Sequence, residues 1–144
     1  MQRQYHRGAN TSDSAGKPHL LTKYKTTNNM TASAPVSIDT LKQSASSACA
    51  KALSGVLSYD HTQTSTWSSD IINTLLSDLH GHFGSSYKLV VNSIVLQTSE
   101  AGPQQGLNVA HGAFWDNTKD GLWTYDYNEV KGVRVVVTVT WTAV

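Results

Sequence analysis

Two segments of the chain repeat their apolar residues at steps of three and four, the spacing of one helical face. The first predicts a helix over about 38–57, with Ser37 as its N-cap and Asp39 in its first turn. Cys49 borders the apolar stripe and is interpreted as a small core residue. The stripe is made mostly of small residues, which allow another element to pack closely: Ile38, Leu41, Ala45, Ala48, Ala52 and Val56.

The second helix is predicted over about 67–79, with Ser65 or Thr66 as its cap and Gly81 and Gly84 beyond its end. A wider and bulkier stripe of this kind is expected to cover a sheet. Its members are Trp67, Ile71, Ile72, Leu75, Leu76 and Leu79.

From residue 87 onward the apolar period changes to two, which is typical of strands. Four strands are predicted, over 87–97, 107–115, 122–127 and 133–144, with turn-forming residues between them. The first has apolar residues on both faces and is interpreted as a central strand that is covered on both sides. The predicted fold class is α+β, with two helices followed by a four-stranded antiparallel sheet and packed on one side of it.

The side of the sheet away from the helices is not expected to be polar. Leaving apolar surface in water costs about 25 cal/mol per Å², and a second copy of the chain would recover this free energy. The long turn around Pro103 gives the second strand the reach to exchange between copies. Bulky side chains fall on both pleats: on one Leu89, Val91, Val95 and Trp115, on the other Val90, Ile94, Leu96 and Phe114.

Residues 1–35 are rich in Asn, Thr, Ser, Gly and Lys and are predicted to form a disordered tail, followed by one domain over 36–144. Because Met30 lies just before the first ordered segment, the residues ahead of it are either a tail or an artefact of the gene model. The composition is also acid-poor like that of a transit peptide, but an amphipathic pattern is lacking.

The whole chain has a net charge of +1, from 11 Lys and Arg, 10 Asp and Glu, and neutral His. Residues 1–35 hold five basic residues and one acid (+4), which leaves six basic and nine acidic residues (−3) in the remainder. A folded part without a basic stripe argues against a nucleic-acid-binding protein, although the tail could touch RNA or an acidic surface weakly. No run of about 20 apolar residues is present, so no membrane insertion is expected.

Few residues offer catalytic or metal-binding chemistry. Cys49 is the only cysteine, which excludes an intramolecular disulfide and a cysteine metal cluster. His80 and His82 have a spacing that can ligate a metal, but no third ligand is evident beyond scattered histidines and Asp78, so they are interpreted as an exposed helix end. The acidic residues near the C-terminus cluster around turns without a nucleophile–base pair. No catalytic residue, metal site or cofactor is therefore expected.

Several short motifs resemble the Tctex-type dynein light chains in their order and spacing, over about three quarters of the chain. They are Tyr59-x-His61 followed by Trp67, the helix SSDIINTLLSDL, the strand YKLVVNSIVLQ, Ala101-Gly102, Phe114-Trp115-Asp116 and Asp120-Gly121. The chain departs from the family in an insertion over Pro103–Gly106, in Ser93 and Ala113 where the family often has Cys, and in the polar ending Thr138-Val-Thr-Trp141.

The resemblance implies a homodimer in which the second predicted strand crosses to the partner's sheet. The new edge would bind an extended peptide of dynein intermediate chain, or of a cargo or adaptor protein, by strand addition. The implied location is the cytoplasm, on the microtubule-associated dynein complex of the cytoskeleton. Ser68 and Ser69, at the start of the second helix, would cap a carboxylate or amide of the peptide. The implied edge is Leu107, Asn108, Val109, Ala110, His111, Gly112 and Ala113, anchored by Phe114 and Trp115.

Other interpretations stay open. Trp67, Phe114 and Trp115 are also consistent with plain core residues, and Gly112 with a bulge. The chain is alternatively a dynein-independent dimeric hub whose edge accepts many sequences, or a small α+β enzyme or inhibitor with a similar layout. Because His111 lies within the implied edge, we hypothesise that its protonation at about pH 6 weakens the dimer or the bound peptide.

Overall fold

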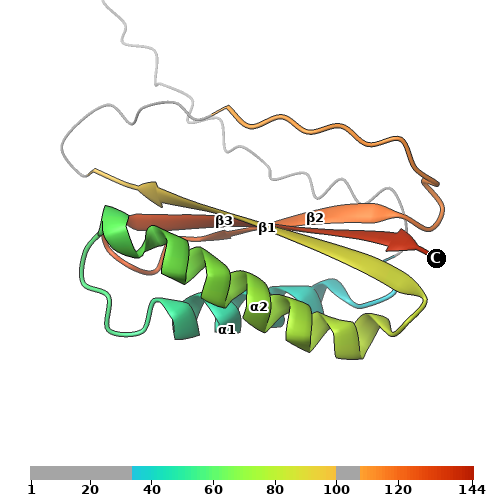
Figure 1. Cartoon of the computed structure of the whole chain (residues 1–144), viewed down its shortest axis with the longest axis horizontal. Helices are drawn as coiled ribbons and strands as arrows, with labels where there is room; N and C mark the ends of the chain where they lie inside the picture. Colours follow the sequence, from blue (N-terminus) through green and yellow to red (C-terminus); the bar gives the residue numbers. More distant parts are fainter. Residues whose placement is uncertain (1–33, 100–107) are drawn as a thin grey trace, which may run out of the picture.

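The computed structural model describes residues 34–99 and 108–144. The two α-helices lie side by side under one face of the sheet, so that the domain has two layers (Figure 1). The predicted α+β class and the order of helices before strands are confirmed. In chain order the elements are α1 (Ile38–Ala52), the short 3-10 helix η1 (His61–Gln63), α2 (Thr64–Phe83), β1 (Tyr87–Gln97), β2 (Gly121–Tyr127) and β3 (Val133–Ala143).

The sheet has three strands in the order β1–β3–β2, and neighbouring strands are antiparallel. Tyr87 pairs with Ala143 and Gln97 with Val133, whereas Gly121 on the other side pairs with Trp141. The interpretation of 87–97 as the central strand is wrong, although its bounds match those of β1. The central strand is β3, because it alone has a partner on each side, and β1 is an edge strand of 11 residues.

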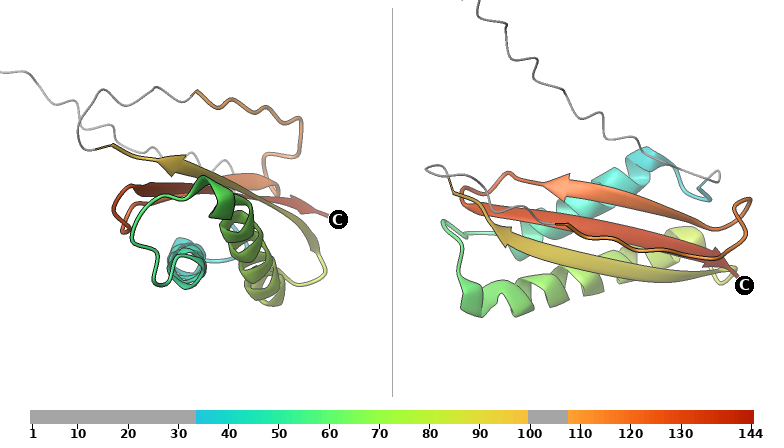
Figure 2. Two further views of the ribbon diagram at one scale, coloured as in Figure 1. Left: turned by 60° about the vertical axis from the view of Figure 1, so that its left-hand side comes forward. Right: turned by 90° about the horizontal axis from the view of Figure 1, so that it is seen from above.

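The predicted strand over 107–115 is not part of the sheet. Residues 108–115 run extended across the helix-free face of the sheet (Figure 2), while Leu107 and the Pro103–Gly106 insertion lie outside the described residues. A strand is defined by backbone hydrogen bonds to a neighbour, and none of the three strands pairs with 108–115. The single chain therefore has a three-stranded sheet, and the predicted fourth strand is not found in it. Exchange of this segment between copies stays a prediction.

Helix α1 begins as predicted but ends earlier. The Ser37 hydroxyl accepts a hydrogen bond from the Thr40 amide at 3.1 Å, and Asp39 lies in the first turn. The helix ends at Ala52 rather than near residue 57, and Gly55 then adopts a φ of 76°. This left-handed conformation cannot continue a helix, although the apolar spacing continues beyond it.

Helix α2 begins earlier than predicted. Its first residue is Thr64, directly after η1, and the Asp60 carboxylate caps η1 by accepting from the Thr62 amide at 2.9 Å. The predicted caps Ser65 and Thr66 are therefore wrong, because both lie inside the first turn of α2. Sequence spacing located the apolar face of this helix but not the η1 turn that precedes it.

The core lies between the helices and the inner face of the sheet. The predicted alternation along β3 is confirmed, since its odd-numbered residues Val133 to Trp141 are fully buried. The indole of Trp141 occupies the space that a side chain at position 121 would need, with Trp141 Cε2 only 2.7 Å from the Cβ position there, so residue 121 has to be glycine. Cys49 is a core residue as predicted, and burial raises the pKa of its thiol to about 12.

Val36, close to the first described residue, packs into the core. Residues 1–33, which make up most of the predicted tail, lie outside the described residues, so the tail stays a prediction. Within 34–99 and 108–144, no helix is long and apolar enough to cross a membrane.

Candidate interaction surface

The side chains at even-numbered positions of the three strands form the face of the sheet opposite the helices, termed the outer face. Val90 on β1 is 63% exposed, and the hydroxyls of Thr124 and Thr138 lie 3.3 Å apart within hydrogen-bonding distance. The outer face thus combines apolar residues with a polar central row. Strand pairing arranges it as three rows: Val90, Thr140 and Leu122; Asn92, Thr138 and Thr124; Ile94, Val136 and Asp126.

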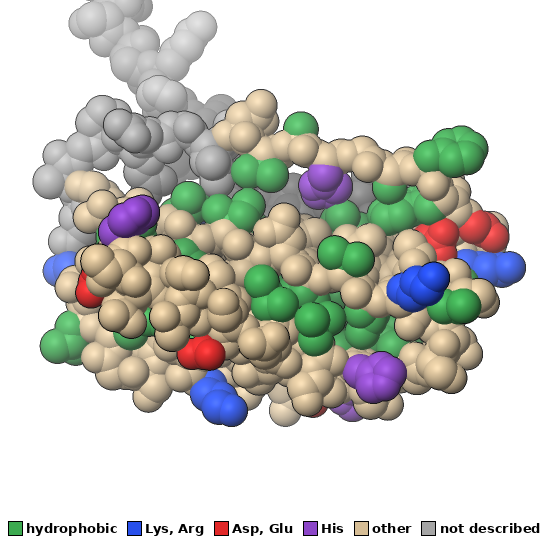
Figure 3. All heavy atoms as spheres, viewed as in Figure 1, with side chains coloured by type: hydrophobic (Ala, Val, Ile, Leu, Met, Phe, Trp, Pro, Cys, Tyr) green, Lys and Arg blue, Asp and Glu red, His purple; other side chains and the backbone are tan. Residues whose placement is uncertain are grey.

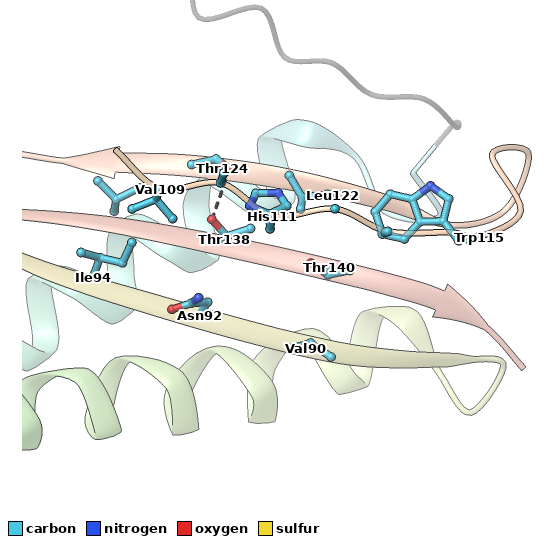
Figure 4. Close-up of a pocket in the computed structure, with 14 residues that line it drawn as sticks. Val90, Asn92, Ile94, Val109, His111, Trp115, Leu122, Thr124, Thr138 and Thr140 are labelled. Atoms are coloured by element: carbon cyan, nitrogen blue, oxygen red, sulfur yellow. Dashed lines mark hydrogen bonds between the residues drawn. The ribbon is translucent and has the colours of Figure 1, made fainter. Parts of the chain in front are cut away.

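Residues 108–115, termed the arm, lie above this outer face (Figure 4). Within the single chain Phe114 is fully exposed, so its interpretation as a plain core residue is wrong, whereas Trp67 is indeed in the core. Trp115 is half-buried and its indole N–H donates to the Asn117 side chain at 3.0 Å. The space-filling view shows hydrophobic side chains interspersed with polar groups on the side of the molecule where the arm lies (Figure 3).

A cavity of about 560 Å³ lies between the arm and the outer face. Val109 and His111 of the arm line this cavity together with Ile94 of β1, Thr124 of β2 and Thr138 of β3 (Figure 4). In proteins, two sheets packed face to face stand about 10 Å apart, with side chains filling the space between them. The arm crosses the outer face without pairing with its strands, and the cavity beneath it is space that further side chains could fill.

The free edge of β1 is the second open feature of this surface. One edge of β1 pairs with β3 along its full length, and the other has no strand partner within the described residues. Unpaired strand edges promote association with other chains unless they are short, charged or covered. β1 is long, and Lys88 is its only charged residue, so this edge is suited to pairing with another strand.

The arm joins β2 through a tight turn over residues 116–120. The amides of Lys119 and Asp120 donate to the Asp116 carbonyl at 3.0 and 2.8 Å. The Thr118 hydroxyl and amide donate to the Asp116 carboxylate at 2.6 and 2.9 Å, and these bonds hold the pKa of Asp116 below its usual value. The Asp120 carboxylate accepts from the Asp116 amide at 2.9 Å and from the Ala143 amide at 2.7 Å, which ties the turn to the end of β3.

One ion pair lies on the outer face at the end farthest from this turn. The Arg134 guanidinium on β3 donates two hydrogen bonds to the Asp126 carboxylate on β2, one of them from Nε at 2.9 Å. Hydrogen bonding to Asp126 raises the pKa of Arg134 further above its usual value. The two charges offset each other, so this end of the face carries little net charge.

Ser68 and Ser69 lie on α2, in the layer opposite the arm. Because α2 begins at Thr64, their backbone N–H groups come after the free donors of the first turn, and a ligand there would have to use their hydroxyls. At the other end of α2, His82 Nε2 lies 4.0 Å from an Asp78 carboxylate oxygen. Among the described residues no group of three or more His, Cys, Asp and Glu could hold a metal ion.

Two features of this surface were not predicted from the sequence. Asp120 was interpreted only as part of an Asp-Gly turn, and its contact with Ala143 joins residues far apart in the chain. The alignment of Thr138 with Asn92 and Thr124 depends on strand register, which sequence spacing alone does not give.

The fold and this surface define a class of protein: a small α+β domain whose sheet has helices on one face only and whose edge strands, β1 and β2, each pair only with β3 among the described residues. A sequence model of the Tctex-1 family matches residues 35–142. The chain therefore belongs to the Tctex-1 family, as the sequence motifs indicated.

The chain is similar to relatives with two kinds of name. It is 32% identical to Topoisomerase I damage affected protein 2 of Zygosaccharomyces rouxii, over 83% of this chain and 98% of that protein. It is 30% identical to a Tctex-type dynein light chain of Dictyostelium discoideum, over 56% of this chain and 68% of the relative. A Tctex-type dynein light chain of Schizosaccharomyces pombe is also 30% identical, over 60% and 77% of the two chains.

Proposed function

We propose that this chain is a non-catalytic light chain of a dynein motor and acts as a homodimeric adaptor that binds extended peptides by strand addition. Its membership of the Tctex-1 family and its similarity to Tctex-type dynein light chains support the motor role. The observation that carries the adaptor role is the arm: among residues 34–99 and 108–144 it lies over the outer face without a strand partner, and the outer edge of β1 is unpaired.

In the proposed dimer, two copies pack outer face against outer face. The arm of each copy stays above its own outer face but pairs with β1 of the partner, and so becomes a strand of the partner's sheet. This arrangement would fill the cavity, cover Val90 and Ile94 and remove the free edge of β1. Each new backbone hydrogen bond contributes about 1 kcal/mol net, in addition to about 25 cal/mol per Å² of buried apolar surface.

The peptide would bind to the edge of the arm that faces away from β1 of the partner. A segment of dynein intermediate chain, or of a cargo or adaptor protein, would pair with the backbone of Leu107 to Ala113, with Phe114 and Trp115 as anchors at one end. Ser68 and Ser69 on α2 would contribute hydroxyls rather than free helix amides. Because a dimer has two such edges, two tethered peptides gain affinity through effective concentration. The corresponding location is the cytoplasm, on microtubule-associated dynein.

A dynein-independent hub is the second candidate function. It is favoured by the similarity to Topoisomerase I damage affected protein 2, which extends over nearly all of that relative and whose name does not mention dynein. The same exposed edge would accept other sequences, since backbone pairing is largely independent of side chains. Recovery of dynein intermediate chain with the purified protein would support the motor role, and recovery of other partners without it would support the hub.

A proline scan over residues 109–113 tests the adaptor role. Successive N–H groups of a strand point to opposite sides, and proline removes one of them. Proline at alternate positions should therefore abolish dimerisation, while proline at the intervening positions should abolish only the binding of an intermediate-chain peptide. Dimerisation is measured by sedimentation and peptide binding by isothermal titration, with a scrambled peptide as control. Equal effects at all five positions, or no effect at any, would contradict strand addition through the arm.

A further inference from the structure

Asp120 is a carboxylate that is only 7% exposed and that joins two distant segments. Its Oδ2 accepts from the amide of Asp116 at 2.9 Å, and its Oδ1 accepts from the amide of Ala143 at 2.7 Å. A buried carboxylate is costly unless its oxygens are satisfied, and backbone N–H groups satisfy it well. This side chain therefore contributes a strong and directional link.

The two linked segments are the base of the arm and the end of the sheet. Asp116 directly follows Trp115, the last residue of the arm, whereas Ala143 is the last residue of β3 and pairs with Tyr87 at the start of β1. One carboxylate thus fixes the base of the arm relative to both the central strand and the free edge strand.

The chain on either side of this link has little freedom. The Asp116 carboxylate and carbonyl bind the amides and hydroxyl of the 116–120 turn. Gly121 lies against the Trp141 indole in the core, which fixes the start of β2. The turn at the base of the arm is therefore held both by the Asp120 carboxylate and by the packing of Gly121 against Trp141.

We propose that Asp120 is a positioning residue that holds the arm above the outer face, in the direction needed to pair with a second copy. The expected effect on the dimer rests on the proposed function, whereas the position of the arm can be measured whether or not the protein is a dimer. An Asp120→Asn substitution keeps the shape of the side chain and replaces one acceptor by an NH2 group, which cannot accept from a backbone amide. It should release one of the two links.

The test uses the full chain with an Asn108→Cys substitution and a spin label on the introduced thiol. Cys49 will not compete for the label, because it is fully buried in the core. The label should broaden the amide resonances of Asn92 and Thr138 beneath the arm. Asp60→Asn is the matched control, since Asp60 also caps a turn by accepting from a backbone amide but lies far from the arm in the chain.

In the Asp120→Asn variant, the broadening at Asn92 and Thr138 should fall by about half or more, and the dimer dissociation constant should rise by about tenfold. Amide exchange within α1 and α2 should stay unchanged, which a general loss of stability would not permit. The Asp60→Asn control should behave as the parent protein. Unchanged broadening in Asp120→Asn, or a loss of broadening that only parallels faster exchange throughout the helices, would overturn the inference.

Two further outcomes separate this inference from the proposed function. A parent protein that is monomeric, with an arm that loosens in Asp120→Asn, would support the anchor and contradict the dimer. A dimeric parent with the same dissociation constant and broadening in Asp120→Asn would contradict the anchor alone. If Asp120→Asn does not fold, Asp116→Ala, which removes the acceptor of Thr118, should loosen the arm to a smaller extent, and unchanged broadening in that variant would overturn the inference.

Discussion

The two faces of the sheet use alternate residues of the same strands for different purposes. On β3, Val135, Val137 and Val139 are fully buried against the helices, while their neighbours Val136 and Thr138 on the outer face are half-buried. Within residues 34–99 and 108–144, two helices close the inner face, whereas the outer face is covered by the arm above a cavity. The free energy of folding therefore comes mainly from the inner face, and the outer face can be used for association without unfolding the domain.

A substitution in the inner face should have the largest effect. Trp141→Ala removes a fully buried indole from the core and should lower the free energy of unfolding by about 3–5 kcal/mol. Val136→Ala, on the outer face of the same strand, should cost less than about 1 kcal/mol because the side chain is half-exposed. Urea unfolding at several protein concentrations measures both values and separates folding from association. Equal losses in the two variants would contradict the division of roles between the faces.

A charge on the outer face should have the next largest effect, on association rather than on folding. Val90→Asp should raise the dimer dissociation constant by at least about tenfold, because a carboxylate would be buried against an apolar surface. Leu57→Asp is the matched control, since Leu57 is 88% exposed in a loop on the helical side. Sedimentation of both variants gives the comparison, and equal dissociation constants would remove the outer face from the interface.

Two serines allow a finer test of the inner layer. The buried hydroxyl of Ser93 has no hydrogen-bond partner among the described residues, whereas that of Ser44 donates to the Asp78 carboxylate. Ser93→Ala should therefore raise the free energy of unfolding by about 1 kcal/mol, and Ser44→Ala should lower it by about the same amount. Thermal unfolding of the two variants checks the sign of each change. Destabilisation by Ser93→Ala would show that its hydroxyl has a partner in solution.

Mild acid should weaken the dimer if His111 lies between the two sheets. His111 lines the cavity together with Thr124 and Thr138 (Figure 4). Strand register places the charged residues Lys88, Asp126 and Arg134 on the same outer face. A positive charge buried in this interface is unfavourable, since Asp126 is already paired with Arg134. Sedimentation should show a larger monomer fraction at about pH 5.5 than at about pH 7.5, and His111→Gln should abolish the difference. The same dimer constant at both pH values would contradict the role of His111.

The smallest expected effect concerns two exposed carboxylates, one on each side of the molecule. Hydrogen bonds from the Thr62 hydroxyl and amide lower the pKa of Asp60, and the equivalent bonds from Thr118 lower the pKa of Asp116. Because the pKa of each carboxyl is lower in the folded state, its ionised form adds to the free energy of unfolding at pH values above the usual pKa of 3.8. This contribution is lost as the pH falls through the pKa of the folded state. A carboxyl-carbon NMR titration should place both transitions below 3.8, and a transition at or above that value would show that the turn is open.

Most of the inner layer could be predicted from the sequence. The spacing along β3 and the apolar stripe of α2 both follow from burial on a single face, which alternation and helical periodicity report directly. Helix ends were less predictable: the apolar spacing runs on to Val56, while the backbone turns at Gly55. The stripe of α2 likewise does not reveal the η1 turn before it.

The outer layer could be predicted only in part, because its arrangement depends on pairing. Apolar residues on both pleats of β1 suggested a central strand, but the single chain places it at the edge. The 107–115 segment has the alternation of a strand and no partner strand among the described residues. Both differences have one explanation under the proposed function, since pairing of the arm with β1 of a second copy would make β1 an internal strand.

The mass of the free protein in solution tests the central claim most directly. Sedimentation equilibrium of the full chain should give about twice the 15.6 kDa of one chain, and Val90→Asp should shift it toward the monomer at about micromolar concentration. A mass of 15.6 kDa for the parent protein at about 100 μM would show that the arm and the free edge of β1 do not join two copies.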